Sequence, residues 1–90
     1  LWENASESGI LTIVPNPVHQ RFRIEFESDE SSDGIMIIRD LSGRMILNTD
    51  LSIHESFNSK EVILPDCSPG AYSIQVISNR KIYNARFIVQ

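Results

Sequence analysis

Residues 13–26 read IVPNPVHQRFRIEF, and this stretch contains both signals that decide the fold. Its second half, QRFRIEF, alternates polar and apolar side chains from Arg21 onward, as expected of a β-strand with one buried face. Its first half places two prolines around Asn16. Pro15 and Pro17 lack a backbone N–H, and each restricts the preceding residue to extended conformations. We therefore expect an extended segment that cannot pair fully, where the chain leaves one sheet and enters another.

Strand signals recur along the whole chain, and no window shows the apolar spacing of a helix. The run GIMIIRD, Gly34–Asp40, is apolar on both faces and indicates a central strand. Strands with one buried face need a second layer, so the predicted fold class is all-β: an immunoglobulin-like, two-sheet antiparallel β-sandwich of about seven strands. The expected strands are Ile10–Val14, Gln20–Phe26, Ile35–Asp40, Arg44–Leu51, Glu61–Leu64, Ala71–Ser78 and Lys81–Val89.

Length and composition narrow the class of protein. The 90 residues suffice for one domain, and a hydrophobic fraction of 41% with 22% charged residues is typical of a folded domain. The formal net charge of −4 argues against nucleic-acid binding, because phosphate backbones favour a clustered positive surface.

Little in the chain points to catalysis or metal binding. No serine lies in a Gly-x-Ser-x-Gly elbow, and His19 and His54 lack metal-ligand spacing. The single cysteine, Cys67, permits no internal disulfide, and no Lys, Arg or His beside it in sequence favours its thiolate. We expect Cys67 to be a small buried hydrophobe, and the domain to be no enzyme, with no cofactor and no small-molecule substrate.

Two polar segments have other expected roles. Glu3–Gly9, ENASESG, indicates a flexible linker, so residues 1–9 are expected to join the domain of residues 10–90 to an upstream part of a longer protein. Glu27–Gly34, ESDESSDG, is acidic, which leaves calcium binding open although its spacing is not that of an EF-hand. We expect a solvated hairpin loop whose charges discourage aggregation through strand edges.

Four pieces of the chain, taken in order, resemble a known family. They are IVPNP at 13–17, IIRDLSGRMIL at 37–47, SPGAYSIQV at 68–76 and KIYNARFIVQ at 81–90. The ordered set is similar to the C-terminal sorting domain of proteins exported by the type IX (Por) secretion system of Bacteroidetes.

The resemblance implies a non-catalytic sandwich that acts as a secretion and sorting signal for an exported cargo protein. The implied partners are the outer-membrane type IX translocon, reached through the periplasm, and its sortase-like cysteine peptidase. This peptidase typically cuts upstream of the domain and attaches the cargo to the cell surface, so the linker would lie on the cargo side. The positions that match the family motifs are Pro15, Asn16, Pro17, Asp40, Gly43, Arg44, Gly70 and Tyr72.

The last of the four pieces, Lys81–Gln90, adds candidates of its own. Its alternation places Tyr83, Phe87 and Val89 on one face, which we expect to fill the core. The opposite face is then available to a translocon, by side-chain contact or by edge pairing. The outer-row candidates for recognition are Ile82, Arg86 and Ile88.

The chain departs from the family pattern at three places. Val14 stands where an aromatic residue often precedes Pro-Asn-Pro, Gln90 stands where the family often ends on a basic residue, and Cys67-Ser68-Pro69 stands where Leu-Pro is common. The alternative function is a structural or adhesive immunoglobulin-like module of a surface protein. A carbohydrate binder of this kind would need exposed aromatic residues, for which Trp2 and Tyr83 are the candidates.

Overall fold

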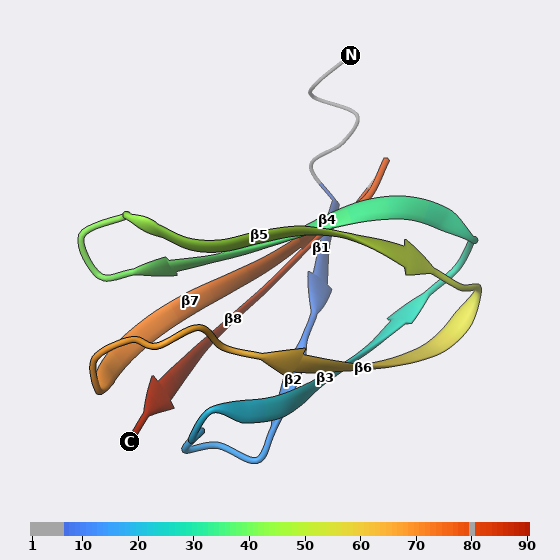
Figure 1. Cartoon of the computed structure of the whole chain (residues 1–90). Helices are drawn as coiled ribbons and strands as arrows, with labels where there is room; N and C mark the ends of the chain where they lie inside the picture. The colour runs from blue at the N-terminus through green and yellow to red at the C-terminus, as the bar shows by residue number, and fades with distance from the viewer. Residues whose placement is uncertain (1–6, 80) are drawn as a thin grey trace.

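The computed structural model describes residues 7–79 and 81–90, which form two packed β-sheets (Figure 1). Its strands are β1 Glu7–Ile10, β2 Thr12–Val14, β3 Arg21–Ser28, β4 Ser32–Asp40, β5 Met45–Ile53, β6 Ser56–Ile63, β7 Gly70–Ile77 and β8 Lys81–Val89. The large sheet has the order β1-β8-β7-β4-β5 and the small sheet the order β2-β3-β6. The described residues contain no helix, and hence no helix long and apolar enough to cross a membrane.

The predicted all-β sandwich is confirmed, with one strand more than expected. All strand pairs are antiparallel except β1 with β8. β4 lies between β5 and β7, as its two apolar faces indicate. The alternation also places the faces correctly, since Phe22, Ile24 and Phe26 of β3 are buried whereas Arg21 and Arg23 are exposed.

A single apolar core fills the space between the sheets. Aromatic rings from both sheets meet there: the ring centroids of Phe22 and Phe87 lie 5.0 Å apart, and those of Phe26 and Tyr83 lie 4.7 Å apart. Burial of this apolar surface is the main favourable contribution to folding. The buried hydrophobic residues are Leu11, Val18, Phe22, Ile24, Phe26, Met36, Ile38, Ile53, Val62, Leu64, Tyr72, Ile74, Val76, Tyr83, Phe87 and Val89.

The segment before Ile10 differs from the expected linker. Residues 7–10 form β1 and pair in parallel with the start of β8. Gly9 is required for this approach, because a Cβ atom at that position would collide with the ring of Tyr83. The strand could not be predicted from its polar composition, because β1 is held by backbone pairing rather than by apolar side chains. Residues 1–6 of the expected linker lie outside the described residues.

The acidic stretch Glu27–Gly34 is not a hairpin loop. Its first two residues end β3 and its last three begin β4, so only residues 29–31 connect the strands, and they pass from the small sheet to the large one. The hydroxyl of Ser28 holds this connection by donating to the carbonyl oxygen of Glu30 at 2.6 Å. Among the described residues, no three His, Cys, Asp or Glu side chains are grouped so that they could hold a metal ion.

The expected crossover at the prolines is also wrong. β2 and β3 are neighbours in the small sheet, so residues 15–20 connect two strands of one sheet. The chain changes sheets earlier, at the buried Leu11 between β1 and β2. Both prolyl bonds, Val14–Pro15 and Asn16–Pro17, are cis. The proline-rich loop does reach the large sheet, but through Val18, which forms a parallel bridge with Val89 of β8.

Candidate recognition site

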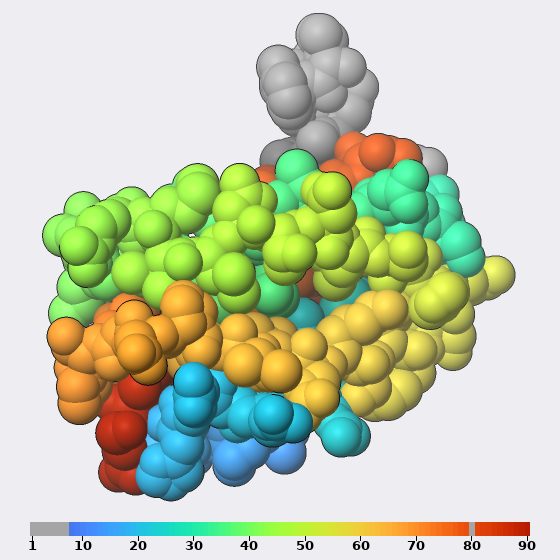
Figure 2. Space-filling view, in the orientation of Figure 1, coloured from blue at the N-terminus to red at the C-terminus, as the bar shows by residue number. Residues whose placement is uncertain are grey.

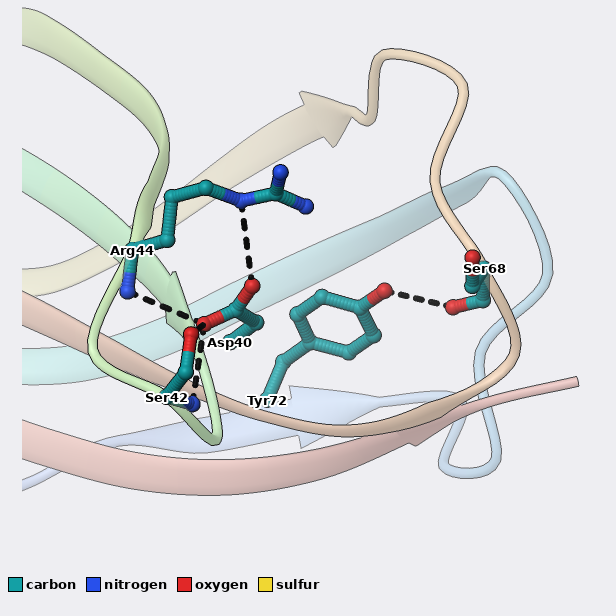
Figure 3. A network of polar contacts seen from close by, with 5 residues as sticks. All are labelled: Asp40, Ser42, Arg44, Ser68 and Tyr72. Carbon is teal, nitrogen blue, oxygen red and sulfur yellow. Dashed lines mark hydrogen bonds and ion pairs between the residues drawn. The ribbon is translucent and has the colours of Figure 1, made fainter.

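The β4–β5 turn is organised by the carboxylate of Asp40 (Figure 3). Its Oδ1 atom accepts hydrogen bonds from the N–H and the hydroxyl of Ser42, at 3.0 and 2.7 Å, and from the N–H of Arg44 at 2.9 Å. The N–H of Gly43 donates to the carbonyl oxygen of Asp40 at 3.0 Å. Gly43 has a φ of 89°, in the left-handed region that glycine adopts without steric cost and that a turn of this kind requires.

The same contacts set the charge of Asp40. The hydrogen bond from the Ser42 hydroxyl lowers the pKa of Asp40 most; partial burial opposes this shift, and the backbone N–H groups of Arg44 and Ser42 lower the pKa further. The Arg44 guanidinium adds a favourable charge, with Nε 3.2 Å from Oδ2 of Asp40. The Arg44 side chain nevertheless remains 76% exposed, so this surface ion pair contributes little to stability and leaves the cation accessible.

Tyr72 lies beside this turn at the start of β7, directly opposite Asp40 in the β4–β7 ladder. Its ring is buried and stacks on Phe87 of β8, with centroids 5.8 Å apart. Its hydroxyl donates to the carbonyl oxygen of Ser68 and so ties down the loop before β7 (Figure 3). Burial raises the pKa of the Tyr72 phenol, and the neighbouring Cys67 thiol raises it further. Tyr72 is therefore a core residue that also fixes the adjoining loop.

Cys67 is half-buried rather than fully buried, in the same loop. It packs against the edge of the core as a small hydrophobe, as predicted, but the loop leaves one side of the residue open. Gly70 begins β7 with a φ of 147° and pairs with Val89.

The proline-rich loop is fastened to the terminal strand. Val18 donates from its N–H to the carbonyl oxygen of Ile88 at 2.7 Å and accepts from the N–H of Gln90 at 2.8 Å. The Oδ1 atom of Asn16 accepts from the N–H of Ile88 at 3.3 Å. The Asn16 side chain is therefore directed at β8 in this structure, where it holds the loop in place, while Pro15 and Pro17 are exposed.

The motif pieces meet at one end of the sandwich, which we call the motif end: the 40–44 turn, the 65–70 loop, the 15–20 loop and the last residues of β8. Asp40 pairs with Tyr72, Gly70 with Val89, and Val18 bridges to Val89. Figure 2 shows the corresponding green, orange, blue and red segments side by side on the left. An open hollow of about 250 Å³ lies there, lined in part by the terminal Gln90.

The expected outer row of β8 is confirmed, but its members are separated. Arg86 and Ile88 are exposed toward the motif end, with Ile88 47% exposed. Ile82 is half-buried at the opposite end of the strand, paired with Ile77 and with Ser8 of β1. The structure therefore brings together ten of the eleven candidate recognition residues and leaves Ile82 apart.

Both edges of β8 are largely occupied by other segments of the domain, so a partner strand could not pair with β8 over most of its length. β7 occupies one edge; on the other, β1 covers residues 81–84 and Val18 bonds to residues 88 and 90. Recognition of β8 in this form would have to use its outward side chains. Val18 and Ser68, which hold the motif end together, were missed in the sequence because an isolated valine and a loop carbonyl carry no periodic signal.

Of the two aromatic candidates for carbohydrate binding, the structure describes only Tyr83. Tyr83 is buried, with its hydroxyl donating to the carbonyl oxygen of Glu27 at 2.8 Å, and Trp2 lies outside the described residues.

The fold is that of a small β-sandwich module, and solved structures contain similar ones. Crystal structures of a β-glucosidase from Listeria innocua match 88% of this chain, in complex with isofagomine at a TM-score of 0.51 and 13% identity, and in complex with glucose at 0.50 and 12%. This chain spans only 16% and 15% of those chains. At such identities the likeness concerns the fold alone.

The family model of the secretion system C-terminal sorting domain matches residues 12–90. The chain therefore belongs to this family, the C-terminal sorting domains of type IX secretion. Membership makes it a sorting signal that interacts with the secretion machinery for export across the outer membrane. A comparison with curated proteins found no match.

Proposed function

We propose that this domain is the address by which the outer-membrane type IX translocon takes up an exported cargo protein, and that it has no catalytic role of its own. The observation that carries the proposal is the convergence, at one end of the sandwich, of motif pieces that are far apart in the sequence. A rigid loop cluster on a stable scaffold is a common form of recognition site.

The proposed contact surface of the motif end consists of its exposed side chains. Arg44 offers a cation, Arg86 offers a second one, and Ile88 offers apolar surface between the loops and the sheet. The half-buried Asp40 and the buried Tyr72 hold this surface in shape rather than touch a partner. A partner with a complementary acidic and apolar patch would fit this arrangement.

We further propose that the sortase-like peptidase cuts on the N-terminal side of Glu7 and attaches the cargo to the cell surface. Residues 7–10 are engaged in β1, and backbone that is paired in a sheet is a poor protease substrate. Sequencing the N-terminus of the released domain tests this point; a cut within residues 7–10 would contradict it.

The test of the main proposal is surface display of a periplasmic reporter carrying residues 1–90 at its C-terminus, in a host with the type IX machinery. The intact domain should bring the reporter to the surface. The double variant Arg86→Ser and Ile88→Ser should lose display and keep its melting temperature, because both side chains are exposed, whereas Phe87→Ala should lose both. A reporter that stays in the periplasm would refute the role of the domain as an address. Display that follows the stability of the variants alone would refute the proposed contact surface.

A further inference from the structure

Four strands lie at sheet edges: β1 and β5 in the large sheet, and β2 and β6 in the small one. An edge strand presents unpaired N–H and C=O groups, and proteins discourage pairing with another chain by short edges or inward-pointing charges. β1 and β2 have only 4 and 3 residues. β6 carries Lys60 on its inner side, opposite the buried Ile24. Each of these three edges therefore opposes strand addition.

β5 has no such protection. It is 9 residues long and contains no proline, lysine or arginine, and its one charge, Asp50, lies opposite Ile35 on the outer face. A register shift where Leu47 and Met45 pair with β4 limits the regular part to residues 47–53. Figure 2 shows this segment, in yellow-green, along the front surface of the molecule.

The inner side of the β5 edge is incompletely covered. Leu47 and Leu51 pack against the core but are only half-buried, and Thr49 between them is exposed although it lies opposite the buried Met36. A strand added beside β5 would cover these leucines as well as satisfy the backbone. Among the residues that the structure describes, no strand pairs with this edge of β5, and its apolar side chains remain partly unburied.

We propose that β5 pairs antiparallel with β5 of a second copy of this chain, about a two-fold axis at Thr49. In this register Leu47 of each copy lies opposite Leu51 of the other, so all four half-buried leucines become covered. Asp50 of each copy likewise lies opposite Asn48 of the other. An axis at Asp50 would oppose two carboxylates, which is destabilising. An axis at Asn48 would pair Leu51 with Met45, which lies beyond the register shift.

The resulting dimer joins two large sheets through an isologous contact. β5 begins beside the motif end, next to Arg44, and runs away from it. Antiparallel pairing therefore directs the two motif ends in opposite directions and leaves both exposed. The inference is independent of the proposed sorting function, because it needs only the free edge.

Sedimentation velocity of residues 1–90, from about 1 µM to about 1 mM, tests the inference over the affinity range of weak dimers. The wild-type mass should rise to that of a dimer with concentration. Thr49→Lys, which copies the inward lysine of β6, should weaken association by about tenfold or more, because it opposes two cations on the axis. Ser59→Lys, an exposed position on the β6 edge, is the matched control and should dimerise like the wild type.

A second measurement does not depend on that variant folding well. In a Cys67→Ser background, Thr49→Cys places two thiols opposite each other, and oxidised glutathione accepts their two electrons and two protons as one disulfide forms. Cross-linking should be about tenfold faster than for Ser59→Cys, because the cysteines are held within disulfide reach.

A wild-type chain that stays monomeric over the whole range would overturn the inference. So would a dimer that Thr49→Lys leaves intact, or equal cross-linking rates at the two positions, since each outcome places the contact elsewhere. Dichroism spectra and melting temperatures at low concentration establish that the variants compared are folded.

Discussion

Asp40 and Gly43 have separate roles in the β4–β5 turn. Gly43 supplies a backbone conformation, and no atom lies within 4 Å of the position that a Cβ would occupy, so a substitution there acts through backbone strain alone. Asp40 supplies hydrogen-bond acceptors, and these depend on its charge. The role of Gly43 can therefore be tested by substitution, and that of Asp40 by changing the pH.

Gly43→Val should lower the free energy of unfolding by about 1–3 kcal/mol, because a β-branched residue is strained at positive φ. Gly43→Asn is the control and should cost clearly less, since asparagine tolerates this region. Urea unfolding at neutral pH measures both. An equal loss of unfolding free energy in the two variants would show that the positive φ of residue 43 does not cause the destabilisation.

The charge of Asp40 predicts a pH dependence. Its folded pKa lies below the ordinary value of 3.8, so its contribution to stability is complete above that value and is lost as the pH falls through the folded pKa. The difference in unfolding free energy between wild type and Asp40→Asn should therefore shrink in acid. Unfolding curves from about pH 6 to about pH 2 test this, and a constant difference would contradict it.

Among the elements, β1 is a strand whose polar composition gives no strand signal in the sequence. It lies at the edge of the large sheet, and Gly9 fits against the buried ring of Tyr83. Together with the contacts of Val18, β1 leaves little of β8 free for backbone pairing. The element that carries the outward recognition candidates is thus held on both sides.

Gly9→Val should destabilise the domain by about 1–3 kcal/mol, because the added side chain displaces the Tyr83 ring or detaches β1. Ser8→Val, at an exposed position one residue earlier, should be nearly neutral. Thermal unfolding of both variants provides the comparison. If Gly9→Val is as stable as Ser8→Val, then β1 does not pack in this way.

At the scale of the whole molecule, the sandwich sorts the candidate residues by position. Arg86 and Ile88 lie toward the motif end and Ile82 lies at the other, although all three alternate along one face of β8. Strand periodicity predicts the face of each residue but not which loops surround it. Because Ile82 and Ile88 share a face and lie at opposite ends of β8, comparing variants of the two shows whether position along the strand matters for export.

Ile88→Ser should reduce surface display of the reporter fusion more than Ile82→Ser does, although Ile82 is the more buried residue and its loss should cost more stability. Display measured by whole-cell labelling, divided by the amount of folded fusion, gives the comparison. The reverse order would move the contact surface away from the motif end.

The sequence by itself determined the fold class, the buried faces of the principal strands and the β4–β5 turn, because each depends on residues a few positions apart. Alternation in β3 and the glycine at position 43 are local signals of this kind. Only the tertiary structure decided that Asn16 bonds to Ile88, 72 residues away, and that β5 is an unprotected edge. Both features depend on which backbone groups the packing of distant segments leaves paired or free, such as the N–H of Ile88 that donates to the Asn16 side chain. A backbone N–H or C=O is the same group whatever side chain its residue carries, so the sequence pattern does not reveal its partner.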